Sequence, residues 1–263
     1  MGERAGGQMR ISVEDLRLTR GEATVLAGVD LTVEAGAVTA VVGPSGVGKT
    51  TLLRAIAGFA PPAAGRIRYD GTDLWGVEEH RRLQLRRTLA MVPQDRSLFN
   101  TTVARNVAYG LGVRGGPLER LRMAVGGVQA TDALAQQVTD ALALVQLAGM
   151  GERAARTLSA GEAQRVAIAR AIATDPAMLL MDEPTSNLDP QTTAVIEEAI
   201  AAAVRRGMGV VIATHDIHQA GRIADRVAVM IGENIIEEGP ATAVLEDAAS
   251  PAARRFLAGE LPL

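Results

Sequence analysis

The 263-residue chain has no cysteine, only 2% aromatic residues and a net charge of −3. The absence of cysteine excludes disulfides, thiolate metal ligands and thiol catalysis. The slight acidic excess argues against a general polyanion binder, because neutralising a phosphate backbone requires a basic face. Long apolar runs are also absent: none approaches the roughly 20 residues that span a bilayer, and the N-terminus lacks the core of a signal peptide. We therefore expect a soluble protein that serves a membrane, if any, from its surface.

Lysine is nearly absent as well, since 26 of the 27 basic residues are arginine and one is Lys49. This residue lies in the stretch GPSGVGKTT, which fits the pattern G-x-x-x-x-G-K-[ST]. An apolar, β-branched run at 38–42 precedes the stretch, and a predicted helix from 49 to 57 follows it. The glycines let the backbone wrap an anion at the positive end of that helix. The pattern therefore predicts a phosphate site.

The chemistry of that site explains the lone lysine. A compact ammonium on a flexible stem can reach between the β- and γ-phosphates of a nucleotide, whereas a planar guanidinium is bulkier. Thr50 supplies a hydroxyl to Mg²⁺. The structural alternative is a glycine-rich turn before a helix, which does not explain why the only lysine falls here. The predicted nucleotide-binding residues of this stretch are Gly43, Pro44, Ser45, Gly46, Val47, Gly48, Lys49, Thr50 and Thr51.

A second apolar run, MLLMDE at 178–183, ends in two carboxylates. Ligand sites of parallel α/β sheets lie at the carboxyl ends of strands. Asp182 can there hold Mg²⁺ directly or through water, and Glu183 can orient and deprotonate an attacking water. A solvated acidic turn before Pro184 is the alternative interpretation.

The order of the predicted elements indicates an α/β parallel sheet, because the later strands alternate with helices at 190–205 and from 216. Residues 60–65 are expected to be a linker. Helical patterns dominate 101–147, interrupted at 110–117 and 126–127, which indicates an insertion into the sheet. The predicted strands are 11–18, 24–33, 38–42, 89–92, 178–181, 209–214 and 226–231.

The stretch RTLSAGEAQR at 156–165 resembles the signature sequence of ABC-transporter ATPases, usually written LSGGQ and followed by a helix. The same residues fit a capping box, with Ser159 as N-cap and Glu162 three residues later. Both interpretations hold together, because a capped helix start with a free hydroxyl also suits a γ-phosphate.

Three further motifs follow the order of that family. Gln94 in MVPQD resembles the Q-loop glutamine, SNLD at 186–189 resembles the D-loop, and His215 in IATHD resembles the switch histidine. The resemblance covers nearly the whole chain, and the ordered series of motifs makes coincidence an unreasonable explanation.

The resemblance implies a single ABC ATPase domain over residues 1–263, with the fold of an α/β P-loop NTPase. A RecA-like core is expected at about 1–93 and 166–263, with an N-terminal antiparallel β portion. An inserted helical subdomain is expected at about 94–165, and no C-terminal regulatory domain is expected.

The resemblance also implies ATP hydrolysis with Mg²⁺ at two sites of a head-to-tail homodimer. Its catalytic residues would be Lys49, Glu183 and His215. Its Mg²⁺ ligands would be Thr50, Gln94 and Asp182. The signature residues Ser159 and Gly161 would reach the nucleotide held by the other copy. The implied partners are transmembrane permease subunits and, indirectly, a solute-binding protein, with no nucleic acid, at the cytoplasmic side of a membrane.

Three positions depart from the family pattern. Ala160 replaces the first signature glycine and is expected to slow hydrolysis, and Glu162 replaces a glutamine. Arg20 stands where the family commonly stacks an aromatic side chain on adenine. A guanidinium can also stack on a base, so Arg20 is predicted to bind the nucleotide with reduced base selectivity.

The transported solute is indicated by resemblance alone. The stretches LFNTTVARNVAYGL, ATHDIHQAGRIADRV and FLAGEL are most similar to ATPases of tungstate importers, with molybdate and phosphate importers close by. This favours an oxyanion importer. The alternative is a soluble ABC ATPase acting on nucleic acid or ribosomes, although the paired cassettes, long coiled coil or basic arm usual in those proteins are not visible. A regulator without turnover conflicts with the presence of Glu183 and His215.

Overall fold

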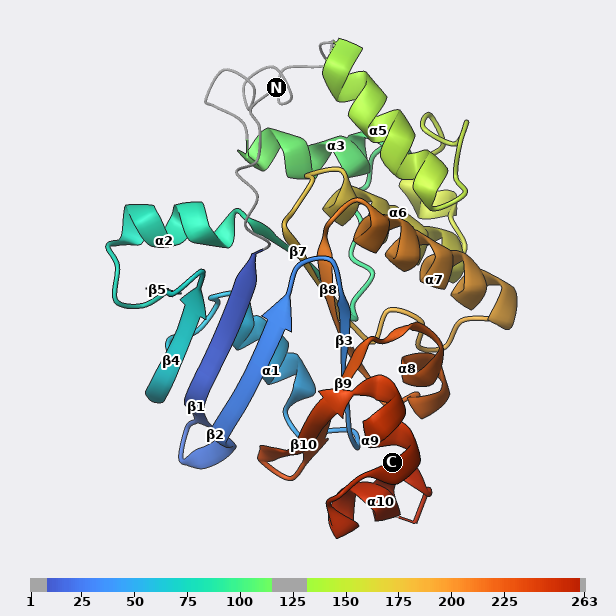
Figure 1. Ribbon diagram of the computed structural model, residues 1–263. Helices are drawn as coiled ribbons and strands as arrows, with labels where there is room; N and C mark the ends of the chain where they lie inside the picture. The colour runs from blue at the N-terminus through green and yellow to red at the C-terminus, as the bar shows by residue number, and fades with distance from the viewer. Residues whose placement is uncertain (1–8, 115–131, 261–263) are drawn as a thin grey trace.

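The computed structural model describes residues 9–114 and 132–260. Its centre is a six-stranded sheet of strand order β10-β9-β3-β8-β7-β6 (Figure 1). All neighbouring strands are parallel except β10, which runs antiparallel to β9. Every residue of β3, β7 and β8 is buried, which explains their largely apolar sequences. The strands are β3 (Val38–Val42), β6 (Leu89–Val92), β7 (Met178–Asp182), β8 (Gly209–Thr214), β9 (Arg226–Ile231) and β10 (Asn234–Pro240).

A four-stranded antiparallel sheet of order β2-β1-β4-β5 lies beside the central one (Figure 1). It consists of β1 (Arg10–Arg20), β2 (Ala23–Glu34), β4 (Ala64–Tyr69) and β5 (Thr72–Asp73). The expected linker at 60–65 was too long, because β4 already begins at Ala64. Gly65 has φ 83°, and a Cβ there would overlap the backbone of Asp15 in β1. The glycine therefore permits close strand pairing instead of marking a loop.

The helices cover the sheets and the two ends of the molecule (Figure 1). Helix α1 lies between the two sheets, since Leu52 and Leu53 share one apolar core with Ile11 of β1 and Leu180 of β7. Helices α3, α5 and α6 pack together at one end. The helices are α1 (Lys49–Ile56), α2 (Glu79–Arg86), α3 (Val103–Arg114), α5 (Asp132–Leu144), α6 (Ala160–Ile172), α7 (Pro190–Arg205), α8 (Ile217–Ile223), α9 (Ala241–Asp247) and α10 (Pro251–Leu257).

The predicted helical stretch contains one wrong interruption. Helix α3 continues through Gly110, where we expected a break. A Cβ on Gly110 would lie 3.0 Å from the carbonyl oxygen of Arg170 in α6, so this glycine serves close helix packing. The expected break at 126–127 lies outside the described residues. The expected core boundary at residue 166 falls within α6.

The order of the central sheet brings three segments together. Strands β7, β8 and β3 are parallel neighbours, so the residues that follow them leave the same edge of the sheet. These are the glycine-rich stretch after β3, the carboxylates that end β7, and His215 after β8.

Candidate active site

The glycine-rich stretch forms a tight loop between β3 and α1. A Cβ on Gly43 would overlap the carbonyl oxygen of Met230 in β9. Gly46 and Gly48 have backbone φ values of 85° and 106°, which residues other than glycine rarely adopt. The conformation of this loop therefore requires glycine at these positions. Because α1 starts immediately afterwards, the loop presents backbone N–H groups at the positive end of a helix.

Lys49 is the first residue of α1, and its side chain is only 6% exposed. Its ammonium donates hydrogen bonds to the carbonyl oxygens of Gly43, at 2.7 Å, and Pro44, at 2.9 Å. Glu183 lies 3.9 Å from the same nitrogen. Burial lowers the pKa of Lys49, and the carboxylates of Glu183 and Asp182 oppose that shift. The ammonium is thus fixed inside the loop, at the edge where a phosphate would lie.

Thr50 and Asp182 form a pair of oxygen donors beside Lys49. The Thr50 hydroxyl donates to Oδ1 of Asp182 at 3.1 Å. Asp182 is only 2% exposed, and burial raises its pKa while the hydrogen bond from Thr50 opposes the rise. A hydroxyl and a carboxylate are ligands that suit Mg²⁺. Among the described residues, no cluster of three or more potential His, Cys, Asp or Glu ligands occurs. The donor set therefore fits a cation that takes its other ligands from phosphates and water.

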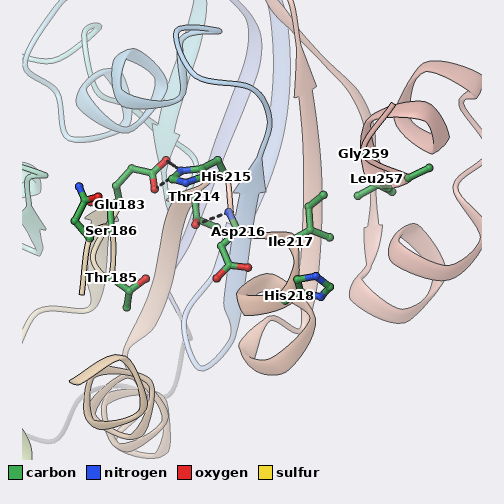
Figure 2. Close-up of a pocket in the computed structure, with 12 residues that line it drawn as sticks. Glu183, Thr185, Ser186, Thr214, His215, Asp216, Ile217, His218, Leu257 and Gly259 are labelled. Atoms are coloured by element: carbon green, nitrogen blue, oxygen red, sulfur yellow. Dashed lines mark hydrogen bonds and ion pairs between the residues drawn. The ribbon is translucent and has the colours of Figure 1, made fainter. Parts of the chain in front are cut away.

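Glu183 and His215 point toward one another from the ends of β7 and β8 (Figure 2). Nδ1 of His215 lies 3.0 Å from Oε1 and 2.9 Å from Oε2 of Glu183. Because an ionised carboxylate only accepts hydrogen bonds, Nδ1 carries the proton in this contact. Glu183 has φ 47°, and its N–H donates to the carbonyl oxygen of Ala213 at 2.9 Å. The strained backbone turns the carboxylate out of the strand direction toward Lys49 and His215.

A cavity of about 690 Å³ opens beside this pair. It is lined by residues 185–187 after Glu183, by the segment from Thr214 to His218, and by Leu257 at the end of α10 with the two residues that follow it (Figure 2). The D-loop-like segment ends at Asp189, which caps α7 by accepting a hydrogen bond from the N–H of Thr192 at 2.8 Å. The Glu183–His215 pair is therefore accessible from a space that also contacts the C-terminal helix.

The predicted capping box is confirmed at the start of α6. Ser159 Oγ accepts from the N–H of Glu162 at 3.2 Å, and Glu162 Oε2 accepts from the N–H of Ser159 at 2.7 Å. Gly161 is buried, and a Cβ there would lie 2.9 Å from Cγ2 of Thr192 in α7. The close packing against Thr192 thus explains why glycine occupies position 161, and the sequence alone did not reveal this contact. Ser159 is exposed, and both of these hydrogen bonds stay within its own helix start.

Two predicted nucleotide-site residues stand apart from the cluster. Gln94 is exposed beyond β6 and makes no hydrogen bond to Thr50 or Asp182. Arg20 is exposed at the end of β1, opposite Ala23. The neighbouring strand β2 does approach the loop, since a Cβ on Gly48 would lie 3.1 Å from the carbonyl oxygen of Val25. Arg20 therefore belongs to the hairpin that flanks the phosphate loop.

A glycine-rich loop before a helix, a buried lysine and a carboxylate strand at one edge of a parallel sheet define a P-loop nucleoside triphosphatase. The solved structure of a nucleotide-free ATP-binding cassette from an ABC transporter has a TM-score of 0.80 to this chain at 25% identity, covering 95% of this chain and 98% of that one. Residues 26–186 match the family described as ABC transporter. The chain belongs to the ABC transporter family and is an ATPase of that family.

Two curated relatives are similar over most of their length. The chain is 53% identical over 237 residues to a phosphate import ATP-binding protein of Natronomonas pharaonis, covering 90% of this chain and 82% of that protein. It is 50% identical over 252 residues to a probable anion import ATP-binding protein of Haloferax volcanii, covering 96% of this chain and 88% of that one. Within the described residues, no helix is both long and apolar enough to cross a bilayer.

Proposed function

We propose that this chain is the ATP-hydrolysing subunit of a membrane importer for phosphate or a related oxyanion. The observation that carries the hydrolytic role is the meeting of Lys49, Asp182, Glu183 and His215 at one sheet edge. The names of the two curated relatives support the anion class, and one of them names phosphate. Neither name mentions tungstate or molybdate. We keep these two oxyanions as competing solutes because of the sequence resemblance described above.

The chain's own groups would perform hydrolysis as follows. Backbone N–H groups of the loop and the Lys49 ammonium bind the phosphates and stabilise charge that develops on the γ-phosphate. Mg²⁺, held through Thr50 and Asp182, would supply further charge neutralisation. Glu183 orients water and accepts its proton. His215 donates from Nδ1 to Glu183 at 3.0 Å, which fixes the orientation of the carboxylate.

A second copy of the chain would complete each site. Ser159 is exposed at a helix start, and its hydroxyl accepts a hydrogen bond from Glu162 of its own helix, with no hydrogen bond to the loop at 43–51. An exposed, capped helix start suits an anion presented by another molecule. ATP would therefore be held between the loop of one copy and the Ser159–Gly161 segment of the other, in an ATP-dependent homodimer.

An aromatic pair supports docking to permease subunits at the cytoplasmic side of a membrane. Phe99 and Tyr109 are 46% and 47% exposed, and their ring centroids lie 4.4 Å apart. The chain has only three Phe and two Tyr residues, so an exposed pair of them in a tilted ring contact is unusual. Aromatic anchors of this kind are typical of protein interfaces.

Reconstitution tests the proposal. The chain is co-expressed with its permease subunits, and the purified complex is reconstituted into vesicles together with the solute-binding protein. ATP hydrolysis is then measured with phosphate, tungstate or molybdate. We expect the strongest stimulation with phosphate and none for the Glu183→Gln variant. Co-purification with ribosomes or DNA in place of hydrophobic permease subunits would instead support the nucleic-acid alternative. Stimulation by tungstate alone would change the solute and leave the transport role intact.

A further inference from the structure

Gln219 of α8 is a polar side chain with no exposed surface and no role in the site described above. Its Nε2 donates to Oγ1 of Thr185 at 2.8 Å and lies 3.5 Å from Oε1 of Glu197 in α7. Thr185 follows Glu183 by two residues. The buried amide therefore contacts the segment that carries the proposed general base.

The other end of Gln219 is fixed to the His215 segment. Its backbone N–H donates to Oδ1 of Asp216, the N-cap of α8, at 2.9 Å. The N–H of Asp216 in turn donates to Oγ1 of Thr214 at 3.0 Å (Figure 2). His215 lies between these two residues, so the position of α8 and the position of His215 are tied together.

The Gln219 amide links residues 184–188 to residues 214–219, beyond the point where the hydrogen bonds of the sheet end. The last backbone hydrogen bond between them is Glu183 N–H to Ala213 at 2.9 Å. Beyond it, within the described residues, no backbone hydrogen bond joins 184–188 to 214–219. The hydrogen bond from Gln219 to Thr185 therefore connects the segments on the far side of the Glu183–His215 contact.

The surrounding charges favour a neutral amide. Glu197 accepts from Arg222 of α8 at 2.6 Å and 3.2 Å, so its charge is already paired. A carboxylate in place of the amide would face Glu197 and could not donate to Thr185 unless protonated. The amide nitrogen lies 3.5 Å from Oε1 of Glu197, and a carboxylate at position 219 would be similarly close. Repulsion between the two carboxylates would raise the pKa of at least one of them. Other titratable groups close to this network are Asp216, His215, Glu183 and His218.

We infer that Gln219 is a positioning residue for hydrolysis: through Thr185 it holds the His215 segment at contact distance from Glu183. The inference rests on the proposed function, in which Glu183 and His215 act on ATP. It predicts an effect on the chemical step and little effect on nucleotide binding, because neither Gln219 nor Thr185 belongs to the phosphate loop.

The test is the ATPase rate of Gln219→Glu relative to the parent between pH 6 and pH 8. At pH 8 the ionised side chain cannot donate, and we expect kcat to fall about tenfold with KM for ATP within about twofold, a loss equal to ~1.4 kcal/mol. At pH 6 the protonated carboxyl donates again, so the ratio to the parent should recover. The native titratable groups occur in both proteins and largely cancel in the ratio. Gln137→Glu, at an exposed position of α5, is the matched control and should show a flat ratio.

A second pair of variants keeps the inference testable if Gln219→Glu does not fold. Thr185→Val removes the acceptor and should lower kcat, whereas Thr185→Ser retains it and should restore the rate. A pH-independent loss in Gln219→Glu, or equal rates for the Val and Ser variants, would overturn the positioning role. A parent without ATPase activity would instead refute the proposed function, which separates the two failures.

Discussion

Replacing Lys49 is the most direct perturbation of the phosphate site, because no other lysine exists to compensate. The ammonium is 6% exposed and already makes two hydrogen bonds, at 2.7 Å and 2.9 Å, to loop carbonyls. A hydrogen bond that involves a charged group contributes about 1.5–3 kcal/mol. Two such bonds to phosphate oxygens amount to about 3 kcal/mol at the lower limit, and Lys49→Ala should therefore weaken ATP binding on the order of 100-fold.

Lys49→Arg should fail to rescue binding although it retains the charge. The pocket of the ammonium is closed by the carbonyl groups of Gly43 and Pro44, and a planar guanidinium would overpack it. Titration of a fluorescent ATP analogue into the parent and both variants measures the effect. Arg206→Lys, at an exposed position after α7, is the control for a conservative exchange of cations. Near-parental binding and turnover by Lys49→Arg would refute the steric explanation for the lone lysine.

Three other predictions address separate parts of the site. Glu183→Gln should bind ATP but not hydrolyse it, and size-exclusion chromatography should show a dimer with ATP and not with ADP; turnover at the parental rate would assign the base elsewhere. In the parent, ATP and GTP should compete within about tenfold of each other. Arg20→Tyr should favour ATP over GTP, because the tyrosine adds a stacking face worth roughly 1–3 kcal/mol. Unchanged affinities for both nucleotides in competition titrations would place Arg20 away from the base. Hydrogen bonding from Ser159 lowers the pKa of Glu162, so its stabilising effect is present above the ordinary pKa and is lost as the pH falls through the lowered one. Glu162→Gln should therefore reduce the thermal midpoint at pH 7, and the difference from the parent should shrink in acid; a constant difference would exclude the carboxylate as its cause.

The parts of the site that follow strand ends could be predicted from the sequence. The loop before Lys49 and the carboxylates at Asp182 and Glu183 have local signals: an apolar run, then glycines or acids. The topology rule for parallel sheets then brings these segments together without further information. The capping box at Ser159 was predictable for the same reason, because its two hydrogen bonds span only three residues.

The contacts that were missed are long-range. Gly65 and Gly110 carry the local signal of a loop, yet both lie inside elements where another backbone approaches closely. Thr192 behind Gly161 and Gln219 behind Thr185 have no local signal, because their partners are distant in the sequence. Only the packing of α6 against α7, and of α8 against the segment after β7, reveals what these residues do.

The packing of Gly161 against Thr192 also distinguishes the two neighbouring positions 160 and 161 in their tolerance of larger side chains. Ala160 is exposed, so its methyl group meets no steric penalty within the chain itself. A methyl at residue 161 would instead press on Thr192, whose hydroxyl donates to Oδ2 of Asp189 at 2.7 Å. We therefore expect a larger residue at 160 to be compatible with the fold and a larger residue at 161 to destabilise it. Two neighbouring residues of one short segment thus differ in their structural constraint: a side chain at 160 would affect only the exposed surface, whereas a side chain at 161 would also disturb the packing of α6 against α7.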